Sequence, residues 1–268
     1  QEKLSQSFKD LGSRLYGSES KSLRELRSRS FDCFKVQGFP TNQDEEWKYT
    51  SLNKIVKRDF DFSSQVSSEI LAEDIEPFLC EGLDSYKLIF INGVFNKSFS
   101  ILGSNEKFFV GSLKQGMKEM PDIINAHYGK LADTKQSLVA LNTAMANEGA
   151  FVYVKKGVKL DKLVQILFVN TNHEESRMMQ TRNLFVLEDF AEAQIFERHQ
   201  AFNQGHVFSN SVTESSVGNQ AHFKHFKLQN DLDSSSMVDS TFVKQGANSS
   251  ALVDTFAFSG ELVRNNLH

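Results

Sequence analysis

Three consecutive carboxylates stand beside the only tryptophan of the chain in the stretch "GFPTNQDEEWKYTSL". Asp44, Glu45 and Glu46 are the residue types that act as general acid and general base when two of them face one substrate. On a polar loop such carboxylates are more commonly surface charge, and a lone Trp is more commonly an anchor that packs against a neighbouring element. We therefore predict that Trp47, together with Tyr49, fastens this stretch to another part of the fold while the carboxylates stay solvated.

Two histidines in "HFKH", His222 and His225, resemble a metal-binding pair at first sight. Because side chains alternate along a strand, an offset of three places them on opposite faces, so they are not expected to bind one ion. His199 and His206 belong to no HExxH or Hx3H pattern and are predicted to be exposed strand or loop residues. The histidines therefore predict no metal site.

The remaining candidates for chemistry are an acidic pair and two cysteines. Glu188 and Asp189 in "NLFVLEDF" are the type of pair with which a β-helix polysaccharide lyase holds calcium, although ordinary β-turns contain such pairs too. Cys33 and Cys80 have no CxxC partner, which argues against a zinc site or a disulfide framework. No GxxxxGK[ST], GxGxxG or GxSxG motif occurs. We expect no catalytic residue, no bound cofactor and no metal in this chain.

The totals indicate a globular protein. The chain has 268 residues, 40% hydrophobic and 24% charged, which is enough for a sizeable core. A net charge of -4 provides no basic surface for a nucleic acid. The most apolar run, "LVQILFV", is far shorter than the ~20 residues of a membrane helix, and the start lacks a secretory signal, so a cytoplasmic location is favoured. Because the chain starts at Gln1 and ends without a polar tail, we expect a piece of a longer protein.

Residues 1–60 are predicted to form an N-terminal helical region. Its second half carries one apolar stripe at helical spacing, made of Leu23, Leu26, Cys33 and Phe34. Ser20 or Ser22 can cap the start of this helix. Gly38 can supply the left-handed residue at its end, and Pro40 follows. The helix therefore ends where the acidic stretch begins.

Residues 61–85 are a charged connector with weak periodicity, and residues 86–268 are predicted to form the β-rich core. In "YKLIFINGVFNKSFSI" an Asn-Gly pair between apolar runs predicts a hairpin. A helical insertion is expected near 113–132, with a further short helical turn in 140–149.

Four segments after residue 151 resemble one another, each with a short strand, a turn of small residues and an alternating strand. Aligning Val158, Ala191, Gly218 and Ala247 gives spacings of 33, 27 and 29 residues. Such a strand repeat without a propeller signature predicts a right-handed parallel β-helix preceded by the helical region, with a β-sandwich as the rival fold. The residues expected to stack in its core include Phe223, Phe226, Phe242, Phe256 and Phe258.

The opening stretch resembles the Gly-x-Pro and Glu-Glu-Trp-Lys/Arg-Tyr-Thr signature of the SufD branch of the SufB/SufD family of iron–sulfur cluster assembly proteins. Three later stretches resemble successive core motifs of that family: "ALNTAMANEGAFVYVKKGVKLDKLVQI", "RNLFVLEDFAEAQIFERH" and "GELVRNNLH". The resemblance covers the chain from about Leu23 to His268, and the four motifs occur in the same order as in the family. The signature residues, for which we expect a structural role, are Gly38, Pro40, Glu45, Glu46, Trp47, Tyr49, Arg264 and Asn265.

The resemblance implies a non-enzymatic scaffold subunit of the SufBCD complex. Such a subunit pairs with SufB and with the SufC ATPase, so ATP is used on SufC and the iron–sulfur cluster is handled by the whole complex. The cysteine and histidine segment of the family and its SufC-binding helices would lie after His268, so no cluster ligand is carried over to this sequence. A SufB-like scaffold and, from another class, a β-helix carbohydrate-active enzyme remain as alternatives.

An incomplete β-helix also has a physical consequence. Its last turn would present unpaired N–H and C=O groups, which invite pairing with another chain. We therefore expect this chain to self-associate, with a homodimer among the expected states.

Overall fold

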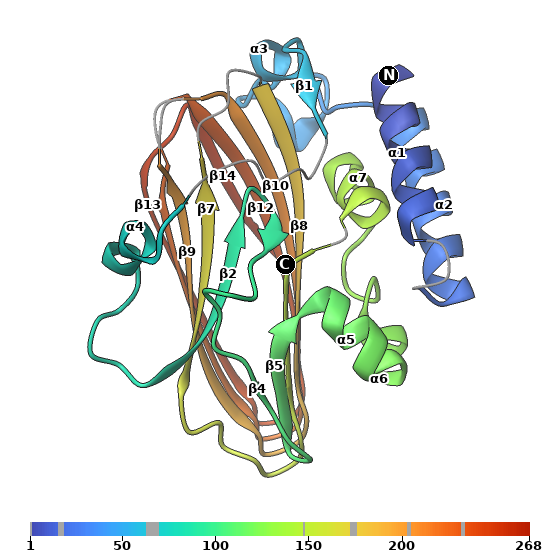
Figure 1. The fold of residues 1–268 in the computed structure, drawn as a ribbon. Helices are drawn as coiled ribbons and strands as arrows, with labels where there is room; N and C mark the ends of the chain where they lie inside the picture. The colour runs from blue at the N-terminus through green and yellow to red at the C-terminus, as the bar shows by residue number, and fades with distance from the viewer. Residues whose placement is uncertain are drawn as a thin grey trace.

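The structure is a computed structural model that describes residues 2–15, 19–62, 70–146, 148–171, 176–202, 205–231 and 234–268. Two β-sheets face each other, and successive strands of the later chain alternate between them (Figure 1). Pairing between these alternating strands is parallel, as in β8 with β10 and β9 with β11. This is the predicted parallel β-helix, because a sandwich would be built mainly from antiparallel pairs.

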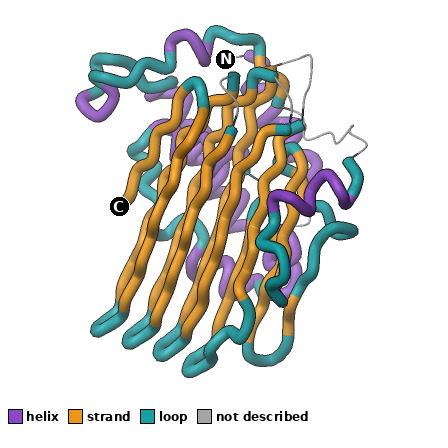
Figure 2. The backbone as a smooth tube through the Cα atoms, turned by 90° about the vertical axis from the view of Figure 1, so that its left-hand side faces the viewer, coloured by secondary structure: helices purple, strands orange, loops and turns teal. Residues whose placement is uncertain are grey.

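The two sheets differ in composition. Sheet A contains β4 (Gly103–Ser104), β5 (Phe108–Ser112), β6 (Ala150–Val154), β8 (Ser176–Leu187), β10 (Val207–Val217), β12 (Ser235–Gln245) and β14 (Leu262–Leu267), with β1 (Phe60–Asp61) beside β8. Sheet B contains β3 (Val94–Phe95), β2 (Ser85–Ile91), β7 (Leu163–Asn170), β9 (Glu192–Ala201), β11 (His222–Asn230) and β13 (Ser250–Ser259). Figure 2 shows the long strands running side by side and ending in stacked turns.

The predicted N-terminal helices are α1 (Glu2–Leu15) and α2 (Lys21–Gln37). Ser20 is the cap of α2, since its hydroxyl accepts a hydrogen bond from the Leu23 amide at 3.2 Å. Gly38 ends the helix with a φ of 69°, where its lack of a Cβ removes the steric penalty. The 3-10 turn η1 (Glu45–Trp47) and the short helix α3 (Asn53–Val56) follow.

A second helical layer covers the outer face of sheet A. It consists of α5 (Leu113–Glu119), α6 (Pro121–His127) and α7 (Ser137–Met145), so the insertion predicted near 113–132 continues to Met145 (Figure 1). Helix α7 lies between α2 and the sheet, which is why all nine of its residues but the first are buried. The helix that the sequence shows only as a short turn is thus the central element of the helical layer.

The predicted connector contains α4 (Ala72–Ile75) and the turn η2 (Glu76–Phe78), while residues 63–69 lie outside the described part. Its apolar residues pack on the outer face of sheet B over β2 and β7, where Ile75 contacts a cluster with Ile89 and Leu167. The following hairpin is confirmed, because Ile91 pairs with Val94 across Asn92 and Gly93. Both turn residues have positive φ, 51° and 76°, as a type I′ turn requires.

The register confirms the repeat but corrects two of the four aligned positions. Strand pairing makes Ala221 and Ser249 the equivalents of the first two positions, rather than Gly218 and Ala247, which lie earlier in their turns. The true landmark of each turn is a residue with positive φ, such as Gln220 at 54°. Small residue types alone were therefore a misleading guide to the alignment.

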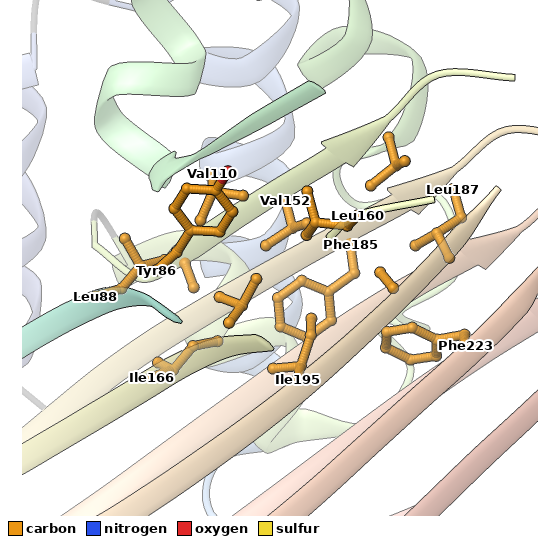
Figure 3. Close-up of a cluster of buried hydrophobic side chains, with 14 of the residues drawn as sticks. Tyr86, Leu88, Val110, Val152, Leu160, Ile166, Phe185, Leu187, Ile195 and Phe223 are labelled. Carbon is orange, nitrogen blue, oxygen red and sulfur yellow. The ribbon is translucent and has the colours of Figure 1, made fainter. Parts of the chain in front are cut away.

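The core between the sheets is apolar toward one end of the strands. Val152, Phe185, Ile195 and Phe223 converge there (Figure 3). A single alternation along each strand decides which side chains enter this core.

The prediction that five phenylalanines line the core is wrong for four of them. Phe226 lies three residues from Phe223 and therefore points to the opposite face, and Phe242 packs with Val212 under the helices. The side chains of Phe256 and Phe258 are 53% and 70% exposed. No helix among the described residues has the length and apolar character needed to span a membrane.

Candidate functional site

The first and last signature stretches meet in space. The guanidinium carbon of Arg264, on β14, lies 4.3 Å from the centre of the Trp47 ring, a cation–π geometry. Arg264 also donates a hydrogen bond from Nη1 to Thr50 Oγ1 at 3.4 Å. Trp47 is only 8% exposed, so the prediction that it is an anchor agrees with its position.

Local hydrogen bonds set the orientation of the tryptophan. The Asp44 carboxylate accepts the Thr41 amide at 2.7 Å, and the Asp44 carbonyl accepts the Trp47 amide at 2.8 Å. These bonds fold the acidic stretch into η1 and direct the ring into a cluster that includes Phe34 and Leu138. Trp47 therefore joins α2, α7 and the last strand of sheet A.

A cleft of about 570 Å³ lies beside this anchor. Its walls come from the acidic stretch, the start of α7 and the outer faces of β12 and β14. Glu45 and Glu46 are exposed on it, and neither carboxylate forms a hydrogen bond or an ion pair with another described residue. The cleft thus provides negative charge and an apolar floor, but it holds no positioned acid–base pair.

The other signature residues have separate positions. Pro40 lines the cleft. Tyr49 is 92% exposed, which corrects the prediction that it helps to fasten the stretch: two residues after Trp47 the chain has left η1 and its side chain points to solvent. Asn265 faces the interior of the β-helix, where it exchanges hydrogen bonds with Gln229 at 2.9 and 3.1 Å. The side chains of Asn265 and its neighbour Arg264 therefore point to opposite faces of β14.

The interior of the β-helix contains a buried ionic network that the sequence analysis missed. Glu197 Oε1 is 2.6 Å from His199 Nε2, and Glu197 Oε2 is 2.9 Å from His225 Nε2. The amide of Asn183 donates to the same carboxylate at 3.1 Å. Glu197 and His225 are completely buried, and His199 is 2% exposed, so the prediction of an exposed His199 is wrong.

A buried lysine completes the network. Lys227 Nζ donates to Asp239 Oδ2 at 2.6 Å and to Thr241 Oγ1 at 2.7 Å, across the two sheets. Burial opposes the charge of Lys227, but the carboxylates of Asp239 and Glu197 hold its pKa above the ordinary value. Burial likewise opposes the charge of Glu197, yet Lys227 and the two histidines hold its pKa well below the ordinary value.

Alternation could have revealed this network. Glu197 and His199 occupy the same face of β9 as Ala193 and Ile195, which belong to the apolar core. The signal in the sequence was that the alternate positions of this strand are first apolar and then charged, so the charged residues share the face of the apolar ones. His222 and His225 do lie on opposite faces, as predicted, with His222 exposed.

A second buried ion pair fastens the helical layer to sheet A. Arg182 Nη2 on β8 contacts Glu214 Oε2 on β10 at 2.6 Å, and both side chains are at most 1% exposed. Glu214 also accepts the amides of Gly129, Leu131 and Ala132 at 2.8 to 3.1 Å. The segment after α6 is therefore held by a carboxylate from the sheet.

The remaining candidate residues have structural partners or no site around them. Glu188 accepts hydrogen bonds from the Tyr153 hydroxyl and the Lys156 amide, and Asp189 accepts the Asn219 amide at 2.7 Å. The acidic pair thus organises stacked turns.

The cysteines are not brought together into a site, and both thiols are unpaired. Burial raises the pKa of Cys80, which disfavours its nucleophilic thiolate form. His206 is exposed, as predicted. The described part of the chain contains no group of three histidine, cysteine or acidic side chains suited to a metal ion.

Two family models match the chain. The SufBD protein N-terminal region matches residues 1–166, and the SufBD core domain of the SUF system for FeS cluster assembly matches residues 168–268. Together the two matches cover nearly the whole chain.

Curated relatives agree with these matches. The chain is 26% identical over 260 residues to an iron–sulfur cluster assembly SufBD family protein of Synechocystis sp., covering 94% of this chain and 57% of the relative. It is 25% identical over 235 residues to the iron–sulfur cluster assembly protein SufD of Escherichia coli, covering 85% and 51%. For the chloroplastic protein ABCI7 of Arabidopsis thaliana the identity is 25% over 259 residues, covering 94% and 53%. The chain spans about half the length of these relatives. With both family models matched in order, it belongs to the SufBD family of iron–sulfur cluster assembly proteins.

Proposed function

We propose that the protein containing this chain is a SufD-like scaffold subunit of a SufBCD-type assembly complex and has no catalytic turnover of its own. The observation that carries the proposal is the β-helix itself, at whose centre Glu197, Lys227 and Asp239 are each held by other interior side chains. Glu197 holds two histidines and Lys227 holds Asp239, so these groups are committed to the interior. Such an interior suits a rigid support better than a substrate site.

The proposed partners are a SufB-like subunit and a SufC-like ATPase. ATP would then be used by the ATPase, and the iron–sulfur cluster would be the cargo of the whole complex. Family membership and the similarity to SufD of Escherichia coli support this proposal. The proposed location is the cytoplasm or an equivalent compartment, since one relative is chloroplastic by name.

Co-purification tests the proposed function. The full-length protein, carrying an affinity tag, is co-expressed with the SufB and SufC homologues of its own organism. We expect both to be retained after a salt wash. In a parallel co-expression with SufC and a SufD homologue, retention of both there but not of SufB would instead assign the chain to the SufB-like side, and retention of no partner in either experiment would contradict the scaffold role.

A further prediction concerns the strands at the end of the β-helix. Strands β13 and β14 each pair with a described strand on one side only. Because an unpaired edge can add a strand from another molecule, we predict that the present chain self-associates. Leu267 is 63% exposed on β14, so Leu267→Lys is expected to reduce the association. Light scattering over a range of concentrations measures this. A concentration-independent monomer for the parent chain would contradict the prediction, and Val36→Lys, at an 88% exposed position of α2, is the matched control.

A further inference from the structure

One lateral row of side chains across sheet A contains four buried oxygens that lack a hydrogen-bond partner among the described residues. Glu148 pairs in register with Thr181 on β8, Thr181 with Ser211 on β10, and Ser211 with Asp239 on β12. The four atoms are Glu148 Oε2, Thr181 Oγ1, Ser211 Oγ and Asp239 Oδ1. None of the four residues is more than 7% exposed.

The row belongs to the interior of the β-helix. Asn183, two residues after Thr181, faces Glu197 of the opposite sheet, and alternation gives Thr181 the same direction. Asp239 reaches Lys227 of the opposite sheet with its other oxygen. The row therefore runs beside the ionic network and is continuous with it at Asp239.

Strand spacing explains why these oxygens do not bond to one another. Neighbouring strands of a sheet lie about 4.8 Å apart, so equivalent side chains in one row are separated by a similar distance. That separation is too long for a direct O–H···O bond of about 2.8 Å, but one water molecule between two oxygens can bond to both. The repeat of the β-helix thus produces evenly spaced places for bridging water.

The neighbouring inward side chains are small and polar. The inward residues of β10 are small hydroxyl residues over four successive positions, Ser209, Ser211, Thr213 and Ser215. A buried hydroxyl or carboxyl without a hydrogen-bond partner lowers the stability of the folded protein by about 1 to 3 kcal/mol. Four such groups in one row are therefore a substantial penalty unless water satisfies them.

We propose that this row binds a file of ordered water molecules, and that the file is the path by which protons exchange between the Glu148 carboxyl and the buried Lys227–Asp239 pair. A hydroxyl both donates and accepts, so Thr181 and Ser211 can continue a chain of hydrogen bonds that begins at one carboxyl and ends at the other. For each proton that passes inward along the file from Glu148 to the Lys227–Asp239 pair, one proton returns outward by the same path. The charge of the file is unchanged.

The end at Glu148 is suited to proton exchange. Glu148 lies between α7 and β6, and its residual exposure of 7% gives it the closest approach to solvent in the row. Burial raises its pKa to about 7, opposed by the charge of Lys114, so the carboxyl takes up and releases protons near neutral pH. The other end is closed by Lys227, whose ammonium protons are the ones the file would exchange.

The water itself is tested by counting long-lived internal water molecules with oxygen-17 magnetic relaxation dispersion. Ser211→Val removes the central hydroxyl and fills its space, so we expect a lower count than in the parent. Ser209→Val is the matched control, on the same strand and face but outside the row of unpartnered oxygens. An equal count in the parent and in Ser211→Val, with both folded, would overturn the proposal.

The proton path is tested by nitrogen-15 NMR of the Lys227 ammonium group. We expect its protons to exchange with solvent several-fold more slowly in Thr181→Val than in the parent, at denaturant concentrations where the exchange rate does not depend on unfolding. Ser211→Ala is a second variant in case Thr181→Val does not fold. Unchanged exchange in the folded variants would refute the path, and a high-resolution crystal structure with the four oxygens in direct protein contacts would refute the water file.

Discussion

Replacing Lys227 with Met is expected to lower the free energy of unfolding by about 3 to 5 kcal/mol, since removal of one member of a buried ion pair leaves its partner uncompensated. Lys227 Nζ is 2.6 Å from Asp239 and is completely buried. Its charge also keeps Glu197 ionised in the interior. The substitution therefore leaves two buried carboxylates on facing sheets without a cation between them.

The stability that is lost in Lys227→Met should become smaller as the pH falls. The pKa of Glu197 is depressed in the folded protein, so its contribution to stability is present above the ordinary value of 4.5 and is lost as the pH falls through the folded pKa. Protonation of Glu197 removes the charge that requires Lys227. The difference in stability between parent and Lys227→Met should therefore be full at neutral pH and shrink below about 4.5.

Lys224→Met is the matched control for this experiment. Lys224 lies on the same strand but is exposed on the opposite face, so its substitution should change the free energy of unfolding by no more than about 0.5 kcal/mol. Urea denaturation at several pH values measures both variants. Equal stabilities of Lys227→Met and the parent at neutral pH would show that the network is not a stabilising feature.

Trp47→Ala is expected to lower the free energy of unfolding by about 3 to 5 kcal/mol, the range for large aromatic residues truncated in a core. The ring is 8% exposed, packs with Phe34 and Leu138, and lies under the guanidinium of Arg264. Its removal detaches the acidic stretch from α2, α7 and β14 together. Thermal and urea denaturation measure the loss, and no reaction is expected to disappear with it.

Tyr49→Ala is the matched control for Trp47→Ala. Tyr49 is an aromatic residue two positions away, but its side chain is 92% exposed. Its truncation should change the stability by less than about 0.5 kcal/mol. A Trp47→Ala variant as stable as Tyr49→Ala would show that the ring is not the fastening between the helical layer and the β-helix.

The sequence predicted those features that depend on local pattern. The Asn92–Gly93 hairpin, the capped helix ending at Gly38 and the repeated strands all follow from residue types at short spacing. The anchor role of Trp47 was also accessible, since a single Trp in a polar segment is seldom left exposed. The contact partner Arg264 was not, because it comes from the far end of the chain and only the fold brings the two together.

The errors within the β-helix share one physical cause, which is the direction of its side chains. His199 was predicted to be exposed and Phe256 to be buried, and the structure reverses both. The hydrophobic character of a residue does not settle which face of a strand it occupies. The register between turns settles it, and the equivalent turn positions are the positive-φ residues Gly157, Phe190, Gln220 and Asn248, only one of which is a glycine.

The scaffold role is tested most directly by the native mass of the assembled complex. The full-length protein is co-expressed with the SufB and SufC homologues of its organism, and the intact assembly is weighed by native mass spectrometry. The proposed function predicts a species whose mass contains this protein together with both SufB and SufC. A full-length protein that remains alone, with both partners folded and present, would contradict it.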